Sequence, residues 1–183
     1  MSVYSSLFCN FLQNTATMFY WKIEFKWTLI FSLVSIMWMV MERILGLHNG
    51  FLEYHLYFSL LSIIPLYVVF TLAIKDKGVN RYEGENQLMN SIYTLLKLIL
   101  LVTISSPFVQ YLALSYVSPN YFKNLAQLAV EQSKFTDLEE AKSVMGFEAY
   151  AFMVILKYFL MSVAASIIVL LVNLKKSGTL RNS

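Results

Sequence analysis

Four long apolar stretches constrain what this chain can fold into. Three of them hold about twenty apolar residues each, at Trp27–Leu47, Leu56–Ile74 and Tyr150–Val172, and the fourth, Ser91–Val117, is interrupted by Lys97 and a few small polar residues. A helix needs roughly 20 apolar residues to cross the ~30 Å hydrocarbon layer of a bilayer. The 183-residue chain is therefore expected to be an all-α integral membrane protein that lies in the lipid bilayer as an antiparallel four-helix bundle.

The composition agrees with this class. Hydrophobic residues make up 58% of the chain and charged residues 14%, whereas soluble proteins average about 25% charged residues. The expected organisation is an N-terminal interfacial or flexible segment, a four-span domain and a short C-terminal tail. These parts are placed at residues 1–20, 21–176 and 177–183, with the spans at about 26–47, 56–74, 91–117 and 149–173.

The basic residues predict how the spans are oriented. Lys and Arg collect on the cytoplasmic flanks of membrane helices. One side of the expected bundle carries Lys22, Lys26, Lys75, Lys77, Arg81, Lys175, Lys176 and Arg181, and the other carries Arg43, Lys123, Lys134 and Lys142. Both termini are therefore expected to be cytoplasmic, in a multi-pass protein of a cell membrane.

The loop between spans three and four is predicted to be structured. Ser118 and Pro119 are typical of an N-cap followed by a proline at the first helical position. Thr136 and Glu139 fit a capping box, and Gly146 is typical of a helix end. Two short amphipathic helices are expected near 119–133 and 137–145. They would either cover the outer helix ends or offer a surface for a ligand or partner.

Two prolines are expected to kink transmembrane helices. Pro65 lies near the centre of the second span, and Pro107 follows two serines in the third. Each proline removes one backbone donor, and a serine hydroxyl or a neighbouring helix can satisfy the carbonyl that is left free.

Three ionisable residues lie inside expected spans, where each needs an explanation. Glu42 lies roughly 24 Å from the inner side and Lys157 roughly 10 Å below the outer face, at ~1.5 Å per residue. These depths are nearly equal, so the two form a candidate intramembrane ion pair; alternatively each reaches separately to the outer interface. Lys97 is about 10 Å inside the inner boundary. It is expected to reach inward, and a role in anion or proton passage is the alternative.

The first outer loop holds a second group of polar residues, namely Glu42, Arg43, His48, Glu53 and His55. Histidines and carboxylates together can bind a metal. However, His48-x4-Glu53-x-His55 is not a recognised ligand spacing, and an Asn-Gly pair interrupts the segment. Polar caps on two helix ends are therefore favoured over a metal site, and no catalytic, cofactor-binding or metal-binding residue is expected.

No motif indicates an enzyme. The sequence has no phosphate-binding glycine loop, nucleophile elbow or metalloprotease helix. Acidic neighbours of the basic loops argue against nucleic-acid binding. The favoured function is non-enzymatic contact with a membrane-protein partner or with other copies of the chain. The alternative is a small oligomeric transporter or channel lined by spans two and three. A pore would need polar residues along one face of a span through its full depth, and no such stripe is expected.

Three groups of residues have an order and spacing found in a known family. They are Lys26-Trp27-Thr28 through Ile36-Met37-Trp38-Met39 with Glu42 and Gly46-Leu47-His48; Lys75-Asp76-Lys77 with Tyr82-Glu83-Gly84; and Ser118-Pro119-Asn120-Tyr121-Phe122 with Glu139-Glu140-Ala141. Together they resemble DUF4199, a four-span membrane family of unknown function that is common in Bacteroidetes-type bacteria. The resemblance covers roughly residues 20–176 and departs at Glu85-Asn86-Gln87-Leu88, where the family often carries more glycine and threonine. It implies the four-span topology and a bacterial inner membrane, and it implies no activity.

Overall fold

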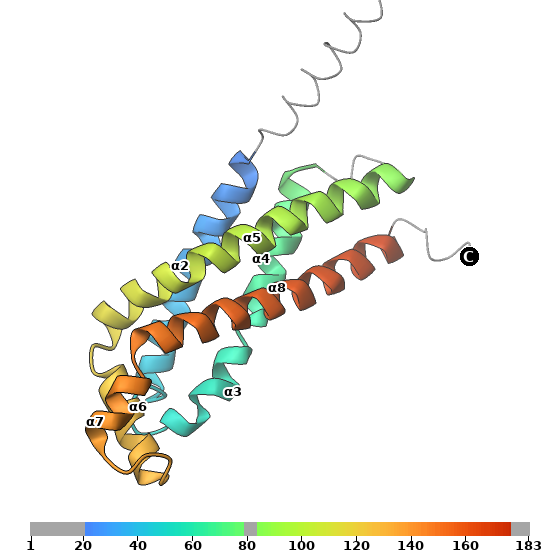
Figure 1. The fold of residues 1–183 in the computed structure, drawn as a ribbon. Coiled ribbons are helices and arrows are strands. Elements are labelled where there is room, and N and C mark those ends of the chain that lie inside the picture. The colour runs from blue at the N-terminus through green and yellow to red at the C-terminus, as the bar shows by residue number, and fades with distance from the viewer. Residues whose placement is uncertain (1–20, 79–83, 177–183) are drawn as a thin grey trace, which may run out of the picture.

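The computed structural model describes residues 21–78 and 84–176, and these residues form helices and no strand (Figure 1). The expected N-terminal segment 1–20 and tail 177–183 lie outside the described residues. The elements are α2 (Lys22–Ile44), η1 (Leu52–Tyr54), α3 (His55–Leu60), α4 (Ile63–Asp76), α5 (Gly84–Val117), α6 (Tyr121–Glu131), α7 (Leu138–Val144) and α8 (Phe147–Lys176).

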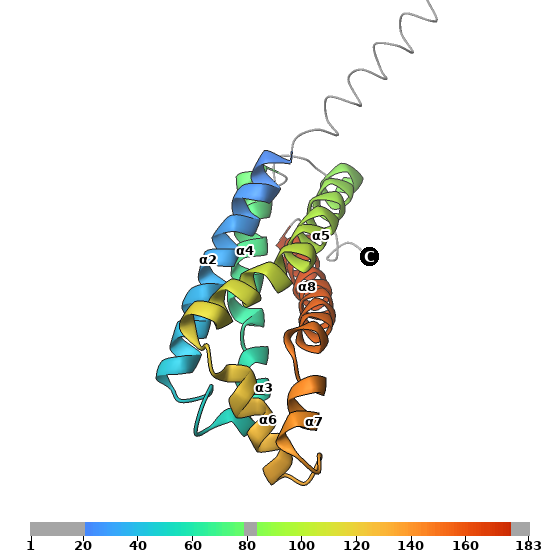
Figure 2. The same cartoon turned by 60° about the vertical axis from the view of Figure 1, so that its left-hand side comes forward.

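Four segments are long and apolar enough to cross a membrane, so the fold is that of a multi-pass membrane protein. They are Lys22–Ile44, Leu52–Asp76, Gln87–Val117 and Phe147–Asn173. Successive spans run in opposite directions, and α2 and α8 each pack against both α4 and α5 (Figure 1). We call the end that carries residues 45–62 and 118–146 the cap end, and the end where α2 begins and α8 ends the base end (Figure 2).

Apolar side chains both fill the bundle and cover its outside. Phe70 and Leu98 are fully buried in the core, whereas Leu33, Met37 and Phe108 remain largely exposed. A soluble protein rarely exposes apolar surface on this scale. In a bilayer the same surface faces lipid, which explains why large side chains occupy both the inner and the outer faces of the spans.

The second span is broken rather than simply kinked at Pro65. Helix α3 ends at Leu60 and α4 begins at Ile63, so Pro65 lies in the first turn of α4. A proline ring clashes with the carbonyl four residues earlier, which here belongs to Leu61. The helix therefore breaks at that point, and the Leu61 carbonyl accepts a hydrogen bond from the Ile64 amide at 3.0 Å.

Helix α5 continues through Pro107 and is bent in Figure 2. Pro107 cannot donate to the carbonyl of Thr103, four residues earlier. The Ser106 hydroxyl donates to that carbonyl instead, at 2.9 Å. A serine next to the proline thus supplies the hydrogen bond that a continuous helix in lipid requires.

The buried face of α2 is unexpectedly polar. Glu24, Thr28, Ser35 and Glu42 are all buried on this helix. At about 100° per residue these four side chains fall within roughly 40° of one another. Phe31 and Met39 are buried on the same face and lie between the polar residues, so these residues form no continuous polar stripe through the depth of α2.

Charged groups at the base end contact partners within the bundle. Glu24 is fully buried and accepts a hydrogen bond from the ammonium of Lys77. The ammonium of Lys97 lies 5.2 Å from the ring centre of Trp21, the residue that precedes α2. Lys97 therefore points towards the base end, the direction in which it was expected to reach.

Candidate metal centre

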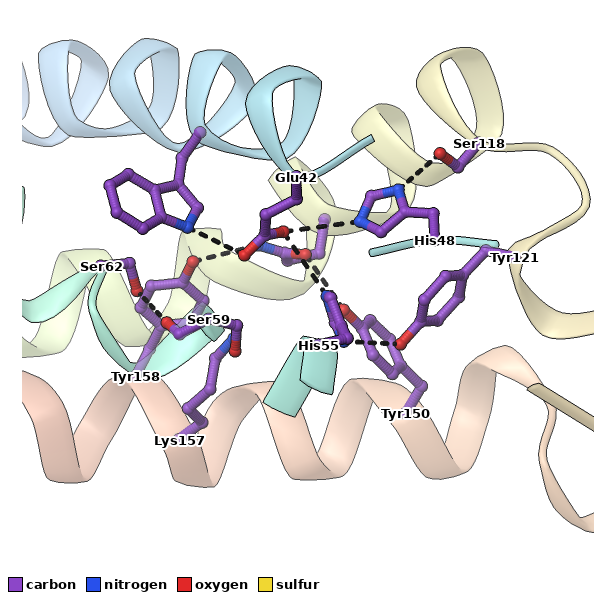
Figure 3. Close-up of polar contacts among 12 residues, drawn as sticks. Glu42, His48, His55, Ser59, Ser62, Ser118, Tyr121, Tyr150, Lys157 and Tyr158 are labelled. Atoms are coloured by element: carbon purple, nitrogen blue, oxygen red, sulfur yellow. Dashed lines mark hydrogen bonds and ion pairs between the residues drawn. The ribbon is translucent and has the colours of Figure 1, made fainter. Parts of the chain in front are cut away.

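Three side chains with metal-binding atoms converge at the cap end (Figure 3). Glu42 lies in the last turn of α2, His48 in the following turn, and His55 is the first residue of α3. Glu42 Oε2 lies 3.5 Å from Nε2 of His48 and 3.5 Å from Nε2 of His55. The three atoms lie within 4.8 Å of one another, so a single ion could contact all of them.

A left-handed glycine turns the chain so that His48 lies over the end of α2. Gly46 has φ +77°, a conformation that glycine adopts without strain. The amide of Leu47 then donates back to the carbonyl of Glu42 at 3.0 Å, which closes the helix end. A Cβ at Gly46 would also meet the ring of Phe51 at 3.3 Å. Glycine at this position thus brings the imidazole of His48 towards the carboxylate of Glu42.

Hydroxyl groups hold the distal nitrogen of each imidazole. His48 Nδ1 lies 2.6 Å from the Ser118 hydroxyl, and His55 Nδ1 lies 3.1 Å from the Tyr121 hydroxyl. Ser118 follows α5 and Tyr121 begins α6, so these contacts join the first outer loop to the second. A hydrogen bond at the distal nitrogen fixes the ring orientation of a metal-binding histidine.

The second carboxylate oxygen of Glu42 is also held. Trp38 Nε1 donates to Glu42 Oε1 at 2.8 Å, one helical turn before it. This contact leaves Oε2 facing the two imidazoles. The carboxylate therefore presents one oxygen to the protein and the other to the centre of the cluster.

The cluster is closed to solvent and surrounded by aromatic rings. Glu42 is 2% exposed and His48 is 1% exposed. The rings of His48, His55 and Tyr121 meet edge to face, with centroids 5.2–5.3 Å apart. Burial, followed by the charge of Glu42, raises the pKa of the Tyr121 phenol, so its hydroxyl keeps its proton at neutral pH.

In the tautomer with the proton on Nδ1, Nε2 of each imidazole faces the Glu42 carboxylate as a second acceptor. When Nδ1 of a neutral imidazole carries the proton and donates to a hydroxyl, Nε2 presents a lone pair. Nε2 of His48 is buried without a hydrogen-bond partner among the described residues. A buried polar atom without a partner calls for an explanation such as an ion. A cation between Glu42, His48 and His55 would satisfy all three atoms.

Lys157, the expected partner of Glu42, belongs to the same region and contacts another residue. Its ammonium donates to the Ser59 hydroxyl at 3.2 Å and lies 4.9 Å from the ring centre of Tyr158 (Figure 3). Among the described residues, the imidazoles of His48 and His55 each lie 3.5 Å from the Glu42 carboxylate, and the Lys157 ammonium makes no such contact with it. The structure therefore brings Lys157 near the cluster without a direct ion pair.

The polar group expected in the first outer loop contains Glu42, His48 and His55 together with Glu53 and Arg43. The structure brings the first three together, whereas Glu53 and Arg43 are both exposed. The spacing of His48, Glu53 and His55 matches no known ligand pattern, so the sequence favours polar caps on the helix ends. The informative signal was the glycine turn that follows Glu42, which returns His48 to the end of its helix.

The fold and this cluster define a small multi-pass membrane protein with a buried centre of two histidines and one carboxylate. The chain belongs to the family described as "Protein of unknown function (DUF4199)", whose model matches residues 26–174. This match confirms the resemblance drawn from the sequence. No curated protein and no solved structure matches the chain.

Proposed function

We propose that this protein binds one divalent transition-metal ion of the zinc class at its cap end, through Glu42, His48 and His55. Imidazole nitrogens and a carboxylate oxygen are ligands that Zn²⁺ prefers. Mg²⁺ and Ca²⁺ require mainly oxygen ligands and fit the two imidazoles poorly. The observation that carries the proposal is the convergence of three ligand atoms within 4.8 Å, with each imidazole held from behind.

The metal would have a non-enzymatic role. Its ligands are almost closed to solvent, which gives a substrate no access to the ion. The hydroxyl groups that hold the histidines connect the first outer loop to α6. We infer that the bound ion fixes the shape of the cap end, through which the protein contacts a partner. We expect this end to lie away from the cytoplasm of a bacterial inner membrane, because the flanks rich in Lys and Arg lie at the base end.

Metal content of the purified protein tests the proposal. The full chain, purified in mild detergent, is expected to bind about one Zn²⁺ or Co²⁺ per chain, measured by elemental analysis and by the visible absorption of bound Co²⁺. Glu42→Gln and His48→Ala are expected to lose the ion. Glu53→Gln is the matched control, because this carboxylate is exposed in the same loop. Equal metal content in all four proteins would contradict the proposal.

Tyr121→Phe is expected to weaken metal binding less than the ligand variants do. This change removes the hydroxyl behind His55 and keeps the ring that packs against both imidazoles. Loss of such a partner typically lowers metal affinity by about 10–100-fold. Competition with a chromophoric chelator would measure the shift. Tyr111→Phe, an exposed tyrosine on α5, is the control and is expected to bind as tightly as the wild type.

A small transporter or channel is the second candidate function, and one observation favours it. The buried face of α2 carries polar side chains from Glu24 at the base end to Glu42 at the cap end. A conducting path needs polar side chains on a buried face, and here Phe31 and Met39 lie between them. The path would lie between α2, α5 and α8. The sequence, through its two prolines, instead favours a path lined by spans two and three.

A further inference from the structure

The lysines at the base end differ in the partners that they contact. Lys26 pairs with Asp76 at 2.8 Å, and Lys77 pairs with the buried carboxylate of Glu24. Lys97 makes neither an ion pair nor a hydrogen bond with the side chains that the structure describes, and its ammonium lies 5.2 Å from the ring centre of Trp21. The positive charge of Lys97 therefore has no counter-ion among the described side chains.

The side chain of Lys97 carries this charge to the membrane interface. Lys97 itself lies within the span Gln87–Val117, and its ammonium reaches back to Trp21, the residue that precedes α2. Long lysine side chains reach the interface in this way, and tryptophan is typical of the headgroup level. An aromatic ring attracts a cation without neutralising it. The contact thus leaves a positive charge at the depth where lipid phosphates lie.

Exposed apolar and aromatic side chains lie on both helices next to this contact, in a region that we call the α2–α5 corner. Those on α2 follow Trp21 at intervals of four residues, and those on α5 lie about one turn to either side of Lys97, so each group shares a helix face with one member of the contact. The ring centres of Trp21 and its neighbour Phe25 are 6.1 Å apart. The side chains, each half exposed or more, are Phe25, Leu29, Tyr93 and Leu100.

A phospholipid matches the α2–α5 corner in both charge and polarity. Its phosphate lies at the level of an interfacial tryptophan, and its acyl chains lie on the membrane side of that level. Lys22 directly follows Trp21 and is exposed, so it adds a second positive charge at this end of α2. Basic residues between transmembrane helices on the cytoplasmic side can bind anionic lipid head groups. An anionic phospholipid fits better than a zwitterionic one, which brings a positive charge of its own towards the two lysines.

We propose that the α2–α5 corner binds one anionic phospholipid of the leaflet at the base end, which is the expected cytoplasmic leaflet. The ammonium groups of Lys97 and Lys22 donate to the phosphate, and the exposed side chains of Phe25 and Leu29 contact an acyl chain. The inference does not depend on the metal centre, because Glu42 and its histidines lie at the opposite end of the bundle. It also does not depend on a path through the protein.

Native mass spectrometry of the full chain tests the proposal. The protein in mild detergent is given equal amounts of phosphatidylglycerol, whose head group is anionic, and phosphatidylcholine, whose head group is zwitterionic. One phosphatidylglycerol per chain is expected to remain bound, in several-fold excess over phosphatidylcholine. Lys97→Gln is expected to lower this retention by about fivefold, which is the typical contribution of one lysine to the attraction of anionic lipid. Lys97→Arg, which keeps the charge, is expected to retain most of the lipid.

Lys75→Gln is the matched control, because Lys75 is an exposed lysine at the same end of the bundle, in the last turn of α4. This variant is expected to retain phosphatidylglycerol like the wild type. Circular dichroism and gel filtration show which variants are folded, and Lys22→Gln, at an exposed position, replaces Lys97→Gln if that protein does not fold. Equal retention of the two lipids, or undiminished retention in the Lys97→Gln protein, overturns the inference. An equal loss in the Lys75→Gln protein also overturns it, because lipid would then respond to the general charge of the base end.

Discussion

Zn²⁺ is expected to raise the thermal stability of the wild-type protein in detergent and to leave the His48→Ala protein unchanged. A ligand that binds only the folded state stabilises it in proportion to the logarithm of its concentration. At free Zn²⁺ about 1,000-fold above the Kd, this stabilisation is about 4 kcal/mol. For a chain of this size, that corresponds to a rise in Tm of roughly 10 °C.

The expected rise in Tm comes from the cap end, because a bound ion would join three separate segments of the chain. Glu42 ends α2, His48 lies in the turn and His55 starts α3. A tryptophan fluorescence or circular dichroism melt with and without Zn²⁺ would measure it. Glu53→Gln is expected to gain as much as the wild type, and Mg²⁺ is expected to give no gain. A shift of the same size in His48→Ala would mean that Zn²⁺ acts elsewhere on the chain.

The class of fold could be predicted from the sequence because a lipid bilayer imposes one simple physical requirement on every span. Each span must hide its backbone groups within a helix and present apolar side chains over about 30 Å. This requirement applies to nearly every residue of a span, so the spans can be identified from their length and apolar composition alone. The broken second span was harder to predict. A proline disturbs the turn before it, so the break falls at Leu61 rather than at Pro65 itself.

The candidate centre depends on contacts that a linear reading does not give. Ser118 and Tyr121 lie some 70 and 66 residues from the histidines they hold. Their approach depends on how α5 and α6 pack against the first outer loop. The approach of His48 to Glu42 is accessible from the sequence, because Glu42 ends a helix and Gly46 reverses the chain directly after it.

The four polar residues on the buried face of α2 can be predicted from their spacing in the sequence. A hydropathy average treats all faces of a helix alike, so Thr28 and Ser35 disappear among their apolar neighbours. The angular positions at 100° per residue place both in line with Glu24 and Glu42. An average over a window therefore hides polar residues that share one face of a helix.

Lys77→Met is expected to destabilise the protein strongly at the base end. The side chain of Lys77 is 24% exposed, whereas that of Glu24 is fully buried, so the change leaves a buried carboxylate without its cation. Removal of one partner of a buried ion pair typically costs about 3–5 kcal/mol. A thermal melt in detergent would show a lower Tm, and Lys77→Arg, which keeps the charge, is expected to lose much less.

Two further variants separate the ion pair from the general effect of losing a lysine. Lys75→Met removes an exposed lysine in the last turn of α4 and is expected to change the Tm little. The double variant Lys77→Met/Glu24→Gln is expected to recover most of the stability, because a neutral amide is far less costly to bury than an unpaired carboxylate. If the Lys77→Met and Lys75→Met proteins had the same Tm, the burial of the Glu24 carboxylate would not depend on its ion pair with Lys77. The same result would mean that the buried carboxylate is already neutral or reaches water at the base end.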